Sequence, residues 1–263
     1  MRDLHCHILP CVDDGAESLE DALAMARLAA DEGLRDIVAT PHHHMLDQSA
    51  PRREVERRVA ELQAALDAEA IPLTIHPGCE VYLTPDSPKQ WDAGELIPLA
   101  GTDFLLVETA FHEYPWYVEE TIFHLQTRGA RIILAHPERY VPFQRDPSLL
   151  EALVARGVLA QITAASLLGA FGKSAKAAAE LFLQRDLVHL IATDAHRPAG
   201  NRSTAIARAR QRAAELVGQK RAWAMTEDLP AAILRGEIID LPPVETRASG
   251  WAFWRRWPVG AGR

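Results

Sequence analysis

The chain has 263 residues, with 28 Lys and Arg against 36 Asp and Glu, so its formal net charge is −8. This acidic balance argues against broad nucleic-acid binding, which requires a basic face. No uninterrupted apolar run is long enough to span a bilayer, and no apolar leader follows Met1. We therefore expect neither a transmembrane helix nor a signal peptide, and a cytoplasmic protein.

Strand-like and helix-like segments alternate along the chain. Ser18 is a suitable N-cap for the amphipathic stretch that follows it, and Gly33 ends that stretch. In chain order the predicted elements are strand Asp3–His7, helix Leu19–Glu32, strand Asp36–Thr40, helix Pro51–Ala70, strand Leu73–Glu80, strand Phe104–Glu108, helix Pro115–Arg128, strand Arg131–His136, helix Ser148–Arg156, strand Leu159–Thr163, helix Lys173–Arg185, strand Val188–Asp194 and helix Ser203–Val217. Seven strands, six of them followed by a predicted helix, predict an α/β fold with a parallel sheet, closed or nearly closed into a barrel.

The three cysteines, Cys6, Cys11 and Cys79, form no C-x-x-C pair, which suits a reducing compartment. Phosphatases with a cysteine nucleophile carry an arginine six positions after the cysteine. Here those positions hold valine, glutamate and proline. We therefore expect no cysteine nucleophile and interpret all three as buried small residues.

Histidines and acidic residues, all potential metal ligands, recur at or just after the ends of the predicted strands. They are His5, His7, His42, Glu80, Glu108, His136, Asp194 and His196. In a barrel of parallel strands these ends meet on one rim, where active sites lie. Histidine supplies nitrogen ligands and the carboxylates supply oxygen ligands, so the pattern predicts a site with several metal ions.

Two short motifs sharpen this prediction. In His5-x-His7 both side chains lie on the same side of an extended strand, so both can reach one ion. We expect Asp194-x-His196 to repeat that arrangement. A carboxylate between two cations can bridge them at a separation of roughly 3.5–4 Å.

Neighbouring residues leave choices open. Within the run His42–His44 we favour His42 as the ligand. Asp13 and Asp14 are most simply solvated loop carboxylates, although Asp14 could serve a third ion. The other histidines are expected to be packed or on the surface: His76, His112, His124 and His189.

Arginines follow two of the predicted ligands. Arg139 lies three residues after His136, and a guanidinium beside a metal cluster is a candidate phosphate clamp because it matches two phosphate oxygens at once. Arg197 and Arg202 follow His196 and are weaker candidates of the same kind.

The order of these motifs resembles a known group of enzymes. H-x-H, TPHH, G-x-E, a strand-end Glu, HPERY and D-x-H resemble the PHP superfamily, and HCHILPCVDDGAES, QITAASLLGAFG and LVHLIATDAH resemble its bacterial capsule and exopolysaccharide tyrosine phosphatases. The resemblance covers nearly all of Met1–Ala195 and fades after Arg202. It implies a PHP-type distorted TIM-like (β/α)7 barrel with a metal site at the C-terminal ends of the strands.

The resemblance also implies three metal ions, usually manganese, with iron or zinc as alternatives. Its ligand sets are His5, His7, Glu80 and Asp194 for the first ion, Glu80 as a bridge with Glu108 and His136 for the second, and Asp14, His42 and His196 for the third. Arg139 matches the phosphate-binding arginine of the family. The sequence departs from the family at Thr163, where we expect asparagine, and at Cys11, where glycine is usual.

The function implied is a metal-dependent phosphotyrosine-protein phosphatase in which a metal-bound hydroxide attacks phosphorus in line. Arg139 and His196 would be catalytic, with Arg139 and Arg202 binding substrate. The implied partner is a bacterial autophosphorylating tyrosine kinase of polysaccharide export.

One alternative is a phosphoesterase acting on a small molecule such as histidinol phosphate. Another is a non-catalytic metal-binding module, against which the complete ligand set argues.

The end of the chain differs in composition from the rest. No linker rich in Gly, Ser or Pro interrupts the earlier part, so we predict one barrel domain over residues 1–240 and a tail over 241–263. The tail contains the run GWAFWRRW. We expect its aromatic residues to fold back onto the barrel. The alternative is docking to a membrane surface or a membrane-bound kinase.

Overall fold

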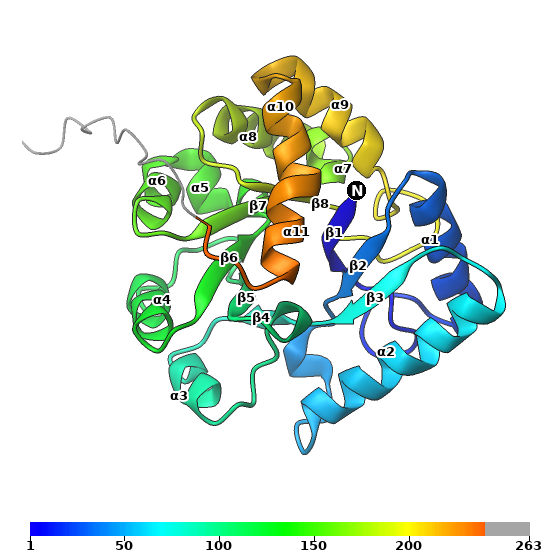
Figure 1. The fold of residues 1–263 in the computed structure, drawn as a ribbon. Coiled ribbons are helices and arrows are strands. Elements are labelled where there is room, and N and C mark those ends of the chain that lie inside the picture. Colours follow the sequence, from blue (N-terminus) through cyan, green and yellow to red (C-terminus); the bar gives the residue numbers. More distant parts are fainter. Residues whose placement is uncertain (240–263) are drawn as a thin grey trace, which may run out of the picture.

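The computed structural model describes residues 1–239, which contain two parallel sheets and the helices around them (Figure 1). The strands are β1 (Arg2–Cys6), β2 (Asp36–Ala39), β3 (Thr74–Pro77), β4 (Glu80–Tyr82), β5 (Phe104–Glu108), β6 (Arg131–Ala135), β7 (Leu159–Thr163) and β8 (Leu190–Ala192). The helices are α1 (Leu19–Asp31), α2 (Pro51–Ala68), α3 (Ser87–Asp92), α4 (Val118–Thr127), α5 (Val141–Arg145), α6 (Ser148–Val154), α7 (Ala164–Leu167), α8 (Gly172–Gln184), α9 (Ile206–Val217), α10 (Gln219–Trp223) and α11 (Leu229–Leu234).

The strands pair in chain order and always in parallel. One sheet has the order β1-β2-β3 and the other the order β4-β5-β6-β7-β8. Isolated bridges connect their edges, one between Cys6 and Ala195 and one between His42 and Glu80. At the first, the His7 amide donates to the Ala195 carbonyl at 2.9 Å and the Asp194 amide to the His5 carbonyl at 2.8 Å; at the second, the Glu80 amide donates to the Pro41 carbonyl at 3.1 Å. The predicted α/β fold with parallel strands is therefore confirmed.

The third predicted strand, Leu73–Glu80, was wrong as a single element. It contains β3, which pairs with β2, and reaches only the first residue of β4, which pairs with β5 in the other sheet. Pro77 has no N–H to donate to a ladder. A side chain at Gly78 would come within 2.7 Å of Val38. The Pro77–Gly78 pair thus ends one ladder, and pairing resumes at Glu80 in the other sheet.

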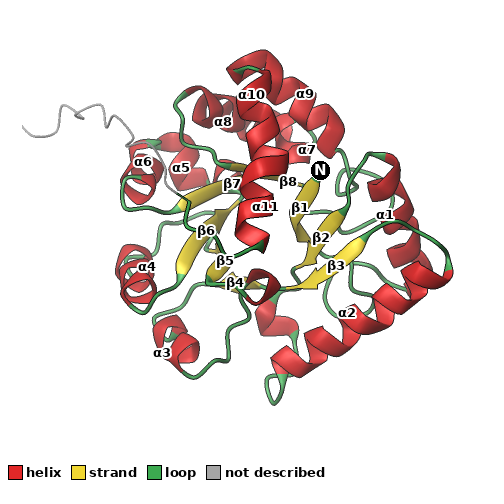
Figure 2. Ribbon diagram, in the orientation of Figure 1, coloured by secondary structure: helices red, strands yellow, loops and turns green. Residues whose placement is uncertain are grey.

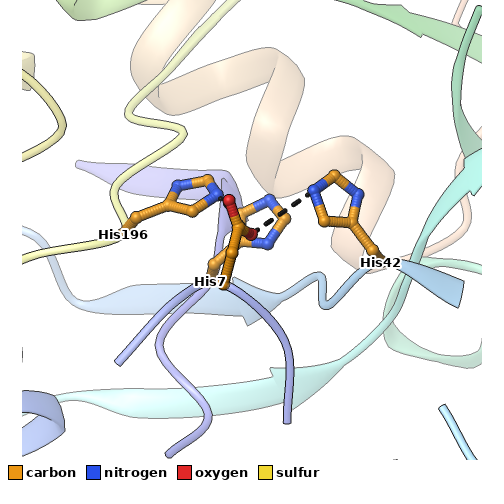
Figure 3. Close-up of side chains that lie close together, drawn as sticks. His7, His42 and His196 are labelled. Atoms are coloured by element: carbon orange, nitrogen blue, oxygen red, sulfur yellow. Dashed lines mark ion pairs between the residues drawn. The ribbon is translucent and has the colours of Figure 1, made fainter. Parts of the chain in front are cut away.

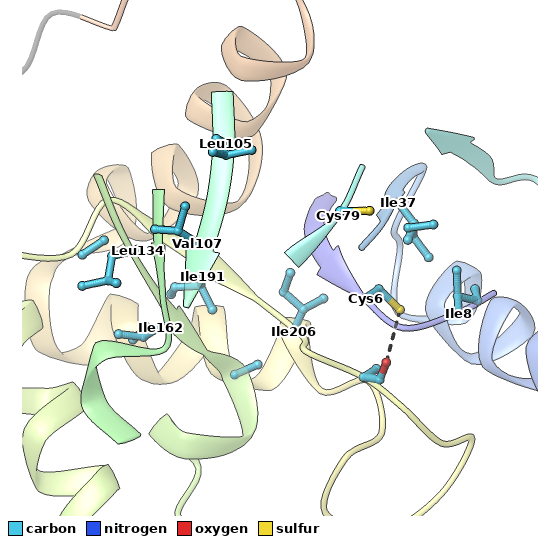
Figure 4. Close-up of a cluster of buried hydrophobic side chains, with 14 of the residues drawn as sticks. Cys6, Ile8, Ile37, Cys79, Leu105, Val107, Leu134, Ile162, Ile191 and Ile206 are labelled. Carbon is cyan, nitrogen blue, oxygen red and sulfur yellow. Dashed lines mark hydrogen bonds between the residues drawn. The ribbon is translucent and has the colours of Figure 1, made fainter. Parts of the chain in front are cut away.

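Alternate residues of the strands enter two different cores. Leu105 and Val107 of β5 belong to the larger cluster, which includes residues of the surrounding helices (Figure 4). Phe104 and Leu106 belong to a smaller cluster with side chains from strands of both sheets and with Ile233 of α11. Successive side chains of a strand point to opposite faces, so each strand is covered on both sides. Figure 2 shows most helices outside the strands, with α11 crossing over them.

The segment after Val217 is more structured than the sequence led us to expect. It forms α10, a π-helical turn over Ala224–Asp228, and α11. None of the described helices is both long and apolar enough to cross a bilayer. The tail predicted for 241–263 lies outside the described residues.

The cysteine prediction holds for two residues and fails for the third. Cys6 and Cys79 are buried, whereas Cys11 is exposed. Cys11 lies in the loop after β1 with φ 58°, the left-handed region that favours glycine. The side chain therefore extends from a tight surface turn rather than packing in the core.

His189, just before β8, has a depressed proton affinity. Its Nδ1 accepts the amide N–H of Ala160 at 3.0 Å, and burial, followed by repulsion from Arg221, lowers the pKa of His189 to about 4. In the unfolded chain a histidine pKa is about 6.5. Between these values the unfolded state binds a proton that the folded state does not, so stability falls as pH falls through this window.

We expect His189→Gln, which keeps a hydrogen-bond acceptor but cannot titrate, to reduce this pH dependence. Urea unfolding at pH 7 and pH 5 should show a loss of stability about 2 kcal/mol larger in the wild type than in the variant. Identical losses in both proteins would show that His189 is not the group responsible.

Candidate metal centre

Residues at or just beyond the C-terminal ends of the strands, together with Glu80 at the start of β4, converge into four overlapping groups of metal-ligand atoms. Glu80 was predicted to close the third strand but instead opens β4. Within each group the ligand atoms lie within 4.8 Å of one another. The groups are His5, His7 and Glu80; Glu80, Glu108 and His136; His7, Asp14, His42 and His196; and His42, His44 and Glu108. Eight of the nine predicted metal ligands belong to these groups, and the ninth, Asp194, lies against them.

Glu80 connects the ligand groups, since its two carboxylate oxygens face different histidines. Oε1 is 2.8 Å from His136 Nε2. Oε2 is 3.4 Å from Nε2 of both His5 and His7, and 3.1 Å from His42 Nδ1. The side chain is 1% exposed. A buried carboxylate that faces separate donor sets with separate oxygens can bridge two cations.

The two histidines of the H-x-H motif present the same nitrogen to the same place. His5 Nε2 and His7 Nε2 are 3.2 Å apart. Asp194 Oδ1 lies 3.5 Å from the first and 3.6 Å from the second. Two imidazoles and two carboxylates therefore surround one point.

The prediction that Asp194 and His196 share one side of an extended strand was wrong. β8 ends at Ala192, and Asp194 has φ 50°. The Asp194 amide donates to the His5 carbonyl at 2.8 Å, while its own carbonyl accepts from His196 Nδ1 at 2.9 Å. The turn, not strand periodicity, directs both side chains into the centre.

Left-handed backbone occurs at two of the converging residues. Asp194 and His136 both adopt it, with φ 50° and 37°. His136 directly follows β6, and Asp194 lies two residues after β8. Such strain costs on the order of 1–3 kcal/mol per residue and concentrates at functional sites.

The third group contains His7, His42 and His196, whose side chains lie close together in Figure 3, and Asp14. The rings of His7 and His196 stack with centroids 3.8 Å apart. Asp14 Oδ1 lies 3.2 Å from His196 Nε2 and 3.5 Å from His42 Nε2. Asp14 thus reaches the centre from the loop after β1.

The electrostatics of the centre favour positive charge. Burial acts to lower the pKa of His7, but hydrogen bonds to Asp13 and Glu80 outweigh it and raise the pKa to about 9. Burial is likewise outweighed at His42, where Glu108 and Glu80 raise the pKa to about 11. The pKa of Glu80 falls well below its usual range because the surrounding histidines outweigh its burial. Buried carboxylates interleaved with imidazole nitrogens are a donor set that fits divalent cations such as Mn²⁺, Fe²⁺ or Zn²⁺.

Two of the three arginines reach this centre. Arg139 Nη1 is 2.6 Å from Asp194 Oδ2. Arg202 donates to Asp14 Oδ2 at 2.9 Å and also contacts His196 Nε2. Arg197 instead donates to Glu17 and to backbone carbonyls of the loop after β1, including that of Asp14 at 3.0 Å. Of the two arginines after His196, Arg202 is therefore the one directed at the centre.

Several participants were missed in the sequence. His44, which we ranked below His42, joins a ligand group with His42 and Glu108. The Arg139 guanidinium lies over two aromatic rings, 5.0 Å from the Phe111 centroid and 4.4 Å from that of Phe171. Asp13 and Gln161 hold the rings of His7 and His5. For Phe171 the available signal was its place in the run LLGAFG. For Gln161 it was its place in a strand otherwise apolar until Thr163.

Comparison with known proteins gives a consistent result. Residues 1–235 match the family of capsular polysaccharide synthesis proteins CpsB/CapC. The chain is 39% identical over 196 residues to the tyrosine-protein phosphatase YwqE of Bacillus subtilis, covering 74% of this chain and 77% of the relative. It is 35% identical over 196 residues to the putative tyrosine-protein phosphatase CapC of Staphylococcus aureus, with the same coverage of each chain.

A solved structure gives the same relationship in three dimensions. It belongs to a study of YwqE from Bacillus subtilis and CpsB from Streptococcus pneumoniae, described there as unique metal-dependent tyrosine phosphatases. It superposes with a TM-score of 0.86 and 34% identity, covering 93% of this chain and 98% of the other. The resemblance to capsule tyrosine phosphatases is therefore confirmed, and the chain belongs to the CpsB/CapC family.

Proposed function

We propose that this protein is a metal-dependent phosphotyrosine-protein phosphatase of capsule or exopolysaccharide synthesis. The observation that carries the proposal is the position of Glu80, whose two oxygens face separate histidine sets. Arg139, a residue able to bind phosphate, lies beside the same centre and contacts Asp194. The relatives named as tyrosine-protein phosphatases support the substrate class.

The proposed fold is the PHP-type distorted (β/α)7 barrel. In it, β3 and β4 together occupy one strand position. Support comes from the hydrogen bonds that connect the edges of the two sheets and from the small core cluster to which strands of both sheets contribute.

The proposed metal complement is three ions, with manganese as the first candidate. His5, His7, Glu80 and Asp194 would hold one ion. Glu80, Glu108 and His136 would hold a second, and Asp14, His42 and His196 a third, with His44 within reach of His42 and Glu108. Such ions, when bound, neutralise phosphoryl oxygens and lower the pKa of water.

The residues of the chain would complete the reaction. Arg139 would orient the phosphoryl group through paired N–H donors, and Arg202 would add a second cationic contact. His196 has its Nδ1 held by the Asp194 carbonyl, which leaves Nε2 directed at the centre. There it could ligate an ion or stabilise the leaving phenolate. Because the pKa of the corresponding phenol is about 10, the leaving group needs little protonation as it departs.

The proposed partner is an autophosphorylating bacterial tyrosine kinase, and the proposed location is the cytoplasm. Both extend the sequence prediction. The family's place in capsular polysaccharide synthesis supports the kinase partner, although the names of the relatives specify no kinase. The location rests on the sequence prediction alone.

Activity measurements test the substrate class. We expect the manganese-loaded protein to hydrolyse para-nitrophenyl phosphate and phosphotyrosine peptides, with strong preference over phosphoserine peptides. Chelators should abolish activity, and vanadate should inhibit less than it inhibits cysteine enzymes. Alkylation of the exposed Cys11 thiol should leave activity unchanged, since no cysteine belongs to the ligand groups. Far more efficient turnover of histidinol phosphate would establish the small-molecule alternative and remove the kinase partner.

Arg139→Ala tests the phosphate clamp. Charged hydrogen bonds contribute roughly 1.5–3 kcal/mol. The variant should therefore lose about one to two powers of ten in kcat/KM while keeping its metal. Arg156→Ala is the matched control, because the exposed Arg156 pairs with Glu119 at 2.6 Å, away from the centre, and it should remain close to wild type. Unchanged kinetics in Arg139→Ala would refute the assignment.

A further inference from the structure

Each histidine of the H-x-H motif is held at its Nδ1 by a different side chain. His7 Nδ1 is 2.6 Å from Asp13 Oδ2, and His5 Nδ1 is 2.9 Å from Gln161 Oε1. An Nδ1–H donated to an acceptor leaves Nε2 unprotonated in the neutral ring, with its lone pair free for a cation. Both Nε2 atoms are thereby turned toward Glu80 and Asp194.

Asp13 has further contacts that Gln161 lacks. Its Oδ2 also accepts the His42 amide at 3.0 Å, and its Oδ1 accepts the Gly15 amide at 2.9 Å. One buried carboxylate therefore connects the end of β1, the loop that carries Asp14, and the segment after β2. These segments supply ligands to different groups of the centre.

The loop after β1 fits closely around this carboxylate. A side chain at Gly15 would lie 2.1 Å from the His7 carbonyl oxygen and 2.8 Å from Asp13 Oδ1. Only glycine fits there, so the backbone at Gly15 packs directly against His7 and the Asp13 carboxylate. The Asp13 side chain is 1% exposed, which makes its hydrogen bonds difficult to replace with water.

We propose that Asp13 is a positioning residue of the metal centre. It fixes the orientation and tautomer of His7 and increases the basicity of His7 Nε2. Through the amides of Gly15 and His42 it also holds the segments that carry Asp14 and His42 beside His7. This rests on the proposed metal-dependent function. Gln161 orients His5 in the same way but contributes no charge. Hydrogen-bond partners that orient metal-bound histidines are common.

Titration calorimetry of the full chain with MnCl2 tests the role without measuring activity. Asp13→Asn keeps the shape of the side chain but offers one acceptor oxygen to three donors. We expect the apparent affinity for Mn²⁺ to fall about 10- to 100-fold. Asp146→Asn is the matched control: Asp146 also accepts an amide two residues ahead, that of Ser148 at 3.1 Å, but is exposed. It should bind Mn²⁺ as the wild type does.

A second measurement applies even where Asp13→Asn does not fold. In the wild-type protein, labelled at histidine ¹⁵N and loaded with diamagnetic Zn²⁺, ring NMR should show His7 coordinated through Nε2 and protonated on Nδ1. Coordination through Nδ1, or an Nδ1 without a proton, would overturn the inference.

The two proposals fail differently. A wild-type protein that binds no Mn²⁺ would overturn the proposed function and the role of Asp13 with it. Wild-type affinity in a folded Asp13→Asn variant would overturn the role of Asp13 alone.

Discussion

Glu80→Ala is expected to lose bound metal and phosphatase activity together. The carboxylate faces His136 with one oxygen and His5, His7 and His42 with the other, so its removal affects at least two ligand groups at once. Cations at such a centre contribute several kcal/mol to transition-state stabilisation, so activity should fall on the order of a thousand-fold or more. Elemental analysis after gel filtration gives the metal content, and para-nitrophenyl phosphate hydrolysis gives the activity.

Glu108→Ala provides the comparison. Glu108 belongs to ligand groups with His136 and His42 but to none with His5, so we expect partial loss of metal. Full metal content in Glu80→Ala would exclude the bridging role. Lost activity with intact metal would instead indicate that Glu80 acts in catalysis without ligation. Circular dichroism must show both variants folded, since Glu80 and Glu108 are buried.

Glu227→Ala is expected to destabilise the fold by about 3 kcal/mol without changing the metal centre. The Glu227 carboxylate, in the π-helical turn before α11, is 2.9 Å from the Met1 ammonium, 3.0 Å from Arg2 and 2.8 Å from Arg35. The Met1 side chain is 3% exposed and the Glu227 side chain 8%. Removing one partner of a buried ion pair is costly because the remaining charge stays buried without compensation.

Thermal unfolding should detect this loss as a decrease in Tm of roughly 6–12 °C. The control is Glu61→Ala, which breaks an exposed pair with Arg57 on α2 and should cost less than about 1 kcal/mol. Metal content should remain that of the wild type, because Arg2 and the ligand-bearing His5 lie toward opposite ends of β1. A Tm within error of the wild type would show that the network contributes nothing to stability.

The sequence by itself determined the order of elements and most of the converging residues. Hydrophobic periodicity and caps are local, so α1, with Ser18 accepting the Asp21 amide, begins and ends close to the predicted bounds. Parallel strands separated by helices must place their C-terminal ends on one side. Strand-end residues such as His5 and Glu108 were therefore recognisable before any contact was known.

Tertiary structure decided what local patterns do not contain. The division of the third strand depends on which sheet each half joins, although Pro77 and Gly78 marked the break. The turn at Asp194 replaces strand alternation, and only the fold shows that Arg202 rather than Arg197 faces the centre. The partner of His5 lies 156 residues away at Gln161. Such orientation arises from packing and hydrogen bonds between distant segments, whereas sequence spacing specifies only which residues can come near the site.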